Sequence, residues 1–295
     1  MPEPDELYTL RNQYWLGNYQ LAINEAATLN RIPAKLAVER DEYVYRSYLA
    51  LGQYGIVLGE IKDTASTNVA LRAVKLLATF MSTPAAQETA IFQMKEWLAD
   101  NTVKNIPSIR LIAATMYMIS DNVAEAMKLL GVTTLEHLAL RVQLFLRIDR
   151  LDLAQKELKT MKVIDEDSTL SMLATAWINL AMGGAKDQEA VYIYEELIDK
   201  HGGSSMLLCG LAVAKMHLGQ FEEAEARLQE ALIKSPSDPD ALANLIAVSQ
   251  HLARAPEVIN RLISQLRAKD PSHPMVVALG NFEKAFDRVA ASLTV

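Results

Sequence analysis

The stretch Leu208–Pro236, which reads LCGLAVAKMHLGQFEEAEARLQEALIKSP, decides the fold of this chain. Its apolar, small and turn residues fall at the spacings of a tetratricopeptide (TPR) unit, a helix–turn–helix repeat of about 34 residues. The matching positions are Leu208, Leu211, Ala212, Gly219, Phe221, Ala224, Leu228, Ala231 and Pro236.

Each of these positions has a physical role in a helix pair. Ala212 and Ala224 are small, so the two helices can approach each other closely. Gly219 ends the first helix, because a left-handed conformation costs least for glycine. Pro236 stops the second helix because it cannot continue the hydrogen-bond ladder. Since one such pair cannot bury its apolar face alone, neighbouring pairs must stack on it.

Similar patterns recur on the N-terminal side. The turns Gly17–Tyr19 and Gly52–Tyr54 repeat the arrangement of Gly219–Phe221, each between two segments with helical apolar periodicity. The other units keep the small residue and the apolar rhythm but lack the glycine or the proline. The predicted helices are 6–15, 19–29, 38–51, 54–61, a looser unit over 68–98, 107–120, 123–130, 135–148, 151–161, 168–182, 189–199, a pair over 205–234, 241–252, 256–267 and 275–290.

This pattern predicts an all-α fold, a single TPR-type solenoid over residues 1–295 that winds as a right-handed superhelix. We expect N-terminal repeats over about 5–165 to bind a partner. C-terminal repeats over about 166–292 include the clearest unit, 205–236. In the last helix Phe282, Phe286 and Val289 share one face, as expected of a C-terminal capping helix.

Composition narrows the possible functions. The net charge is −7, from 29 Lys and Arg against 36 Asp and Glu, and no basic cluster suited to phosphate contacts is visible. The single cysteine, Cys209, cannot form an internal disulfide, which favours the reducing cytosol and a small buried side chain. The N-terminus is acidic and lacks the apolar core of a signal peptide. The uncharged run Ser168–Ala185 contains polar residues and two glycines, which favours a buried helix over a membrane span.

No motif for catalysis or cofactor binding is found, and no catalytic, cofactor-binding or metal-ligating residue is predicted. The histidines lie far apart in the sequence, without partners at metal-ligand spacing. The run Asp165–Asp167 resembles a catalytic carboxylate pair, but we interpret it as acidic groups at the start of the helix that follows, which Asp167 or Ser168 caps. No cofactor is expected.

Several longer runs resemble one family, that of the coatomer epsilon subunit, over nearly the whole chain. They are VERDEYVYRSYLAL from Val38, RLDLAQKELKTMK from Arg150, IDEDSTLSMLATAWINLAMGG from Ile164, FEEAEARLQEAL from Phe221 and NLIAVSQHL from Asn244. The segments RAVKLLATF from Arg72 and KEWLAD from Lys95 look most like the plant and green-algal members. Ala253 stands where many members have glycine.

The resemblance implies a non-enzymatic TPR superhelix of the COPI vesicle coat, on the cytosolic face of Golgi membranes and vesicles. It implies a partner, the C-terminal domain of the coatomer alpha subunit, held by N-terminal repeats that curl around a protruding segment. It also implies a role in retrograde Golgi-to-ER and intra-Golgi transport. No nucleic acid and no direct membrane insertion are expected.

A stable interface with such a partner needs an apolar centre with aromatic anchors. The candidates lie on the first helices of the N-terminal pairs: Tyr14, Tyr45, Tyr48, Tyr117 and Phe145.

Two other functions are weighed against this one. A TPR co-chaperone, or another cytosolic scaffold that binds a peptide segment, would capture a terminal carboxylate with Lys and Asn on successive first helices. In the clearest repeat the inner positions are instead the apolar Cys209 and Val213. An enzyme with a TPR arm is disfavoured because the predicted helix pairs use the whole chain.

Overall fold

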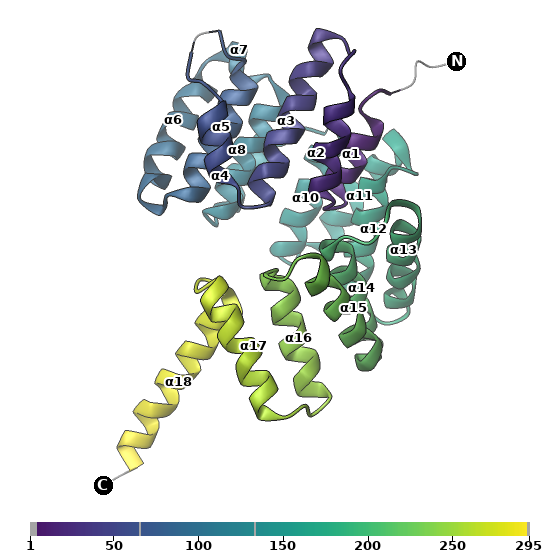
Figure 1. The fold of residues 1–295 in the computed structure, drawn as a ribbon, viewed down its shortest axis with the longest axis vertical. Coiled ribbons are helices and arrows are strands. Elements are labelled where there is room, and N and C mark those ends of the chain that lie inside the picture. The colour runs from purple at the N-terminus through teal and green to yellow at the C-terminus, as the bar shows by residue number, and fades with distance from the viewer. Residues whose placement is uncertain (1–4, 65, 133, 294–295) are drawn as a thin grey trace. The chain divides into compact units, whose positions relative to one another are not determined.

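The structure, a computed structural model, describes residues 5–64, 66–132 and 134–293, and its fold is shown in Figure 1. Every regular element in these ranges is helical, and successive helices are joined by short turns. The chain divides into two compact units, one up to Ala181 and one from Met182. The prediction of an all-α fold built from helix pairs is confirmed. Whether both units form one continuous solenoid stays a prediction.

Unit 1 consists of short helices joined by tight turns. They are α1 (Tyr8–Trp15), α2 (Tyr19–Thr28), α3 (Ala34–Ala50), α4 (Tyr54–Glu60), α5 (Val69–Ser82), a 3₁₀ turn (Pro84–Ala86), α6 (Gln87–Ala99), α7 (Asn101–Lys104), α8 (Pro107–Ile119), α9 (Val123–Leu129), α10 (Leu135–Arg147), α11 (Leu151–Asp165) and α12 (Thr169–Met182). The bounds agree with the sequence prediction within a few residues, apart from the short α7, which was not predicted.

Unit 2 contains the clearest TPR pair. Its helices are α13 (Ala185–His201), α14 (Ser205–His217), α15 (Phe221–Lys234), α16 (Pro239–His251), α17 (Pro256–Lys269) and α18 (Pro274–Leu293). Gly183 and Gly184 both adopt positive φ and separate α13 from the helix before it. α13 therefore starts four residues before the predicted Glu189.

The turns inside the pairs share one backbone conformation. Gly219 has a φ of +75°, and the Gln220 N–H donates to the Lys215 carbonyl, which closes the end of α14. Asp149 and Ala253 take the same left-handed conformation at corresponding turns without being glycine. The repeat geometry therefore persists where the glycine signature is lost.

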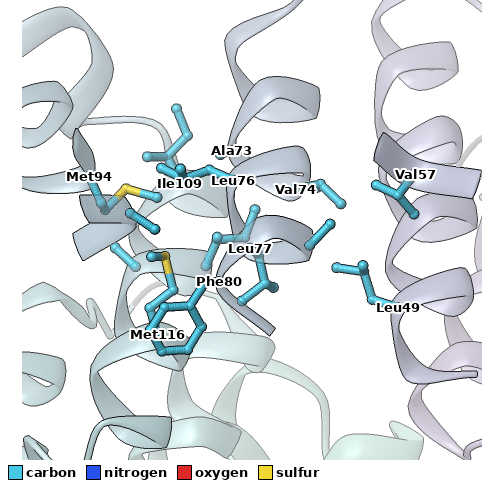
Figure 2. Close-up of a cluster of buried hydrophobic side chains, with 14 of the residues drawn as sticks. Leu49, Val57, Ala73, Val74, Leu76, Leu77, Phe80, Met94, Ile109 and Met116 are labelled. Carbon is cyan, nitrogen blue, oxygen red and sulfur yellow. The ribbon is translucent and has the colours of Figure 1, made fainter. Parts of the chain in front are cut away.

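α5 is the centre of the largest core cluster of unit 1 (Figure 2). Its apolar side chains pack against α3, α4, α6 and α8, and Phe80 is fully buried. The labelled members of this cluster are Leu49, Val57, Ala73, Val74, Leu76, Leu77, Phe80, Met94, Ile109 and Met116. The looser unit predicted over 68–98 thus holds the centre of a continuous core.

α18 packs against the C-terminal cluster of unit 2 through its first turn, where Val276 is buried. Further along the helix, Phe282 and Phe286 are 71% and 74% exposed. The capping contact is therefore made by the start of the helix, and the predicted apolar face is solvent-accessible over the rest.

Of the two caps predicted for the helix that follows, Asp167 and Ser168, the structure shows Ser168, and the interpretation of Asp165–Asp167 as an acidic helix start is wrong. α11 continues to Asp165, so this residue ends a helix instead of starting one. The cap of α12 is Ser168, whose hydroxyl oxygen accepts a hydrogen bond from the Ser171 N–H at 3.2 Å. The Asp165 carboxylate accepts the Asp167 N–H, which leaves the serine free to act as the cap.

Candidate functional site

The first helix of unit 1 returns to helices that lie more than a hundred residues away in the sequence. The Trp15 indole Nε1–H donates to the Glu136 carboxylate on α10 at 3.0 Å. The Thr169 hydroxyl at the start of α12 donates to the Asn12 side-chain oxygen at 2.7 Å, and both residues are buried. These contacts join the first helix pair to the last helices of the unit, so the pairs curve back on themselves.

This curvature forms a half-open cavity of about 850 Å³. It lies wholly within unit 1, and the helices that bound it come from several successive pairs. Its lining residues are Asp5, Tyr8, Arg11, Asn12, Trp15, Lys35, Val38, Glu39, Glu42, Tyr43, Arg46, Asn68, Val69, Ala70, Ile106, Pro107, Ser108, Leu111, Thr134, Leu135, Glu136, His137, Asp165 and Ser168. The volume is in the range of sites that bind small molecules or peptide segments.

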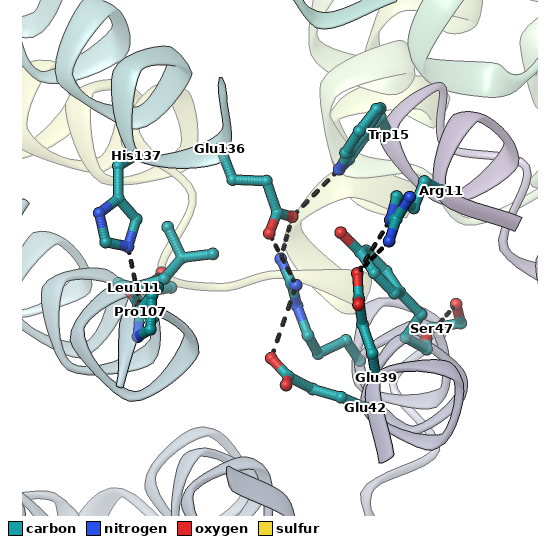
Figure 3. A network of polar contacts seen from close by, with 12 residues as sticks. Arg11, Trp15, Glu39, Glu42, Ser47, Pro107, Leu111, Glu136 and His137 are labelled. Atoms are coloured by element: carbon teal, nitrogen blue, oxygen red, sulfur yellow. Dashed lines mark hydrogen bonds and ion pairs between the residues drawn. The ribbon is translucent and has the colours of Figure 1, made fainter. Parts of the chain in front are cut away.

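Arg46 connects the walls of the cavity and lies beside two carboxylates, Glu42 and Glu136. These two carboxylates are labelled in Figure 3. The Arg46 guanidinium makes two contacts with the Glu136 carboxylate, at 2.9 and 3.4 Å, in the two-pronged geometry that suits arginine. The same guanidinium lies over the Tyr14 and Tyr43 rings, with its central carbon 4.6 and 5.1 Å from the ring centroids. Arg46 thus joins α3 to α1 and α10.

The two carboxylates beside Arg46 have opposite pKa shifts. Burial raises the pKa of Glu136, but the charge and hydrogen bonds of Arg46 and the Trp15 indole outweigh this effect and lower it overall. Glu42 is 6% exposed and lies 3.9 Å from the Arg46 guanidinium, which is too far for a hydrogen bond. Burial therefore dominates, and it raises the pKa of the Glu42 carboxyl to about 7.

His137 is held as a neutral imidazole. The Gly131 N–H donates to Nδ1 at 3.1 Å, so the ring proton lies on Nε2, which donates to the Pro107 carbonyl at 2.9 Å. Burial also lowers the pKa of this histidine, which favours the same neutral form. His137 therefore acts as a structural bridge between α8 and α10.

The cavity wall has an excess of negative charge. Five carboxylates line it, against three cations, Arg11, Lys35 and Arg46. Arg11 is engaged by Asp5 and Glu39, and Arg46 by Glu136. A ligand that enters the cavity therefore meets a wall with more carboxylates than cationic side chains.

The five aromatic candidates lie close to the cavity or in the packing around it. Tyr14 stacks edge-on against Tyr19 and Tyr43 and contacts Arg46. The other four residues lie in core clusters: Tyr45 and Tyr48 are half-buried against the α5 cluster, and Tyr117 and Phe145 are 7% and 8% exposed. None of the five is among the described residues that line the cavity. Their role in partner binding stays a prediction.

Sequence reasoning missed the polar side chains of the cavity. Glu42 and Arg46 are one helical turn apart, so a local ion pair was visible in the sequence. Glu136 pairs with Arg46 across 90 residues, and no local pattern marks such a contact.

Cys209 is buried, and burial raises the pKa of its thiol to about 12, which disfavours the reactive thiolate. In the described part of the chain, no group of three or more His, Cys, Asp or Glu residues is placed to hold a metal ion. No helix among the described residues combines the length and the apolar character that a bilayer span demands.

The fold defines a class of protein, the TPR-type helical solenoids. One similar solved structure is a tetratricopeptide repeat protein from Parabacteroides merdae, with a TM-score of 0.61 and 13% identity over 88% of this chain and 96% of that one. At this identity the likeness shows the fold alone.

The model of the coatomer epsilon subunit family matches residues 3–294, and the chain belongs to this family. Coatomer subunit epsilon-2 of Arabidopsis thaliana is 44% identical, over 97% of this chain and 96% of that protein. Coatomer subunit epsilon of Caenorhabditis elegans is 35% identical, over 97% of this chain and 98% of its own. The expected family and the likeness to plant members are confirmed. The family is a structural component of the COPI coat.

Proposed function

We propose that this chain binds and stabilises the C-terminal domain of the coatomer alpha subunit as a non-enzymatic subunit of the COPI coat. In this role it works on the cytosolic face of Golgi membranes and COPI vesicles. The coat it belongs to carries retrograde Golgi-to-ER and intra-Golgi traffic.

The observation that carries this proposal is the cavity of about 850 Å³ formed by unit 1. It lies among the N-terminal repeats expected to bind the partner. Helices from several pairs bound it, so an extended or hairpin segment placed there is contacted from several sides. Contact from several sides shields the centre of an interface from water and favours a long-lived complex.

The test is co-expression of the chain with the alpha C-terminal domain, followed by gel filtration and calorimetry. A tight one-to-one complex is expected. A chain that is folded by circular dichroism but does not bind would overturn the proposal and leave a helical scaffold with another partner.

The aromatic anchors are tested in the same assay with Tyr48→Ala and Tyr117→Ala. Both are expected to weaken binding while the chain stays helical. Phe92→Ala is the matched control, because Phe92 is 62% exposed on α6, does not line the cavity and is not a predicted anchor. If the two tyrosine variants bind as the wild type does and remain folded, these residues are not anchors.

A further inference from the structure

The carboxylate of Glu42 is buried in the wall of the unit 1 cavity without a cation within hydrogen-bond distance. Its side chain is 8% exposed, and its nearest cation is Arg46 at 3.9 Å. That cation is already engaged by Glu136, which takes the two hydrogen-bonded contacts and adds a second negative charge nearby. When Glu42 is ionised, the group formed by Glu42, Arg46 and Glu136 therefore carries one unbalanced negative charge beside the cavity.

A buried carboxylate without a full partner is costly, and the chain keeps it where a ligand can reach it. The other acidic lining residue on α3, Glu39, is paired with Arg11 at 2.7 Å. Glu136 is satisfied by Arg46 and by the Trp15 indole. Glu42 receives a side-chain hydrogen bond from Ser108 on α8, but no cation hydrogen-bonds to its carboxylate.

We propose that the segment of the alpha subunit that fills the cavity carries a Lys or Arg side chain that pairs with Glu42. This inference rests on the proposed function, since it names the chemistry that the partner must present at that site. A cation fits better than a neutral donor, because it also cancels the excess negative charge of the wall. Charge-assisted hydrogen bonds are the stronger kind, so this contact specifies the register of the segment.

The first experiment compares Glu42→Gln with the wild type in calorimetric titration of the alpha C-terminal domain. Glutamine keeps the shape and one acceptor oxygen but removes the charge. We expect the affinity to fall by at least about tenfold. Asp41→Asn is the matched control. It neutralises the residue that precedes Glu42 in α3, and Asp41 pairs with Arg40 and does not line the cavity. The control is expected to bind as the wild type does.

Folding and binding should move in opposite directions in this variant. Because Glu42 is a buried, poorly compensated charge, its replacement by glutamine is expected to leave the melting temperature of the free chain unchanged or higher. A purely structural role for Glu42 would instead lower the melting temperature together with the affinity, and that result would overturn the inference.

Proton linkage gives an independent readout. The groups that face Glu42 are Arg46 and Glu39 on α3, Glu136 on α10 and Ser108 on α8. Since the pKa of Glu42 is raised to about 7, pairing with a cation at pH 7 ionises it and releases protons. Titration in two buffers of different ionisation enthalpy should show this release for the wild type and not for Glu42→Gln.

The partner side is tested by replacing each Lys and Arg of the alpha domain with Gln. One of these variants should weaken binding to the wild type but not to Glu42→Gln, as a double-mutant cycle requires of a direct pair. If none couples to Glu42, or if Glu42→Gln binds as tightly as the wild type, the inference is wrong and the proposed function stands. If the wild type itself does not bind, the proposed function fails and the inference fails with it.

Discussion

At the scale of single residues, Glu42 and Glu136 show how position decides the behaviour of one chemical group. Both contact Arg46, but only Glu136 receives hydrogen bonds from it. At Glu136 the contacts with Arg46 outweigh the solvation lost on burial, whereas at Glu42 they do not. The pKa values of the two carboxyl groups therefore move in opposite directions.

The raised pKa of Glu42 predicts a pH dependence of stability. Between its ordinary value of 4.5 and about 7, the folded chain keeps a proton that the unfolded chain has lost. The free energy of unfolding therefore falls as the pH rises through this window. Glu42→Gln removes this loss, so its stability advantage over the wild type should grow from near zero at pH 4.5 to about 3 kcal/mol above pH 7. Urea unfolding of both proteins at several pH values measures it, and an advantage that does not change with pH would contradict it.

At the scale of elements, close helix contacts depend on particular small residues. A Cβ added at Gly210 in α14 would lie 2.5 Å from the ring of Tyr194 in α13, whose side chain is buried. By contrast, a Cβ added at Gly280 in α18 would have no neighbour within 4 Å. These two helical glycines therefore have different reasons to be glycine.

The two glycines, Gly210 and Gly280, give a prediction with an internal control. Gly210→Ala should lower the free energy of unfolding by about 1–3 kcal/mol, because the ring of Tyr194 must move. Gly280→Ala should raise it by about 0.5–1 kcal/mol, since alanine is the better helix former and has room. Thermal or urea unfolding of the two variants decides this. Equal effects in both would show that helix propensity, and not the contact with Tyr194, dominates.

At the scale of the whole molecule, the closure of unit 1 depends on a few contacts between helices distant in sequence. Glu136 accepts from both Trp15 and Arg46 and so ties α1 and α3 to α10. These contacts position the helices that bound the cavity. Removal of the Glu136 carboxylate is therefore expected to destabilise the whole of unit 1 and not only α10.

Glu136→Ala should accordingly lower the free energy of unfolding strongly. It leaves the Arg46 guanidinium, which is largely buried, without its main partner, and such a change costs about 3 kcal/mol or more. Glu125→Ala is the control, because Glu125 forms an exposed pair with Lys128 within one helix. Its cost should be about 0.5 kcal/mol or less. Similar urea midpoints for the two variants would mean that the contacts of Glu136 do not hold unit 1 together.

Much of the helical architecture was predictable from local sequence. The turn at Gly219 and the small residues Ala212 and Ala224 mark the clearest pair without ambiguity, because each constraint acts between neighbours in the chain. At the start of α12 the local sequence left Asp167 and Ser168 open as the cap, and it did not show that α11 continues to Asp165.

The sequence by itself determined the all-helical fold, the helix pairs and the family, since periodicity, turn residues and long specific runs are local properties. The closure of unit 1 and its cavity were decided only in the tertiary structure. Arg46 and Glu136 meet across 90 residues, and Asn12 and Thr169 across 157. Small angles between successive helix pairs accumulate into this curvature, so it cannot be inferred from the sequence of any single repeat.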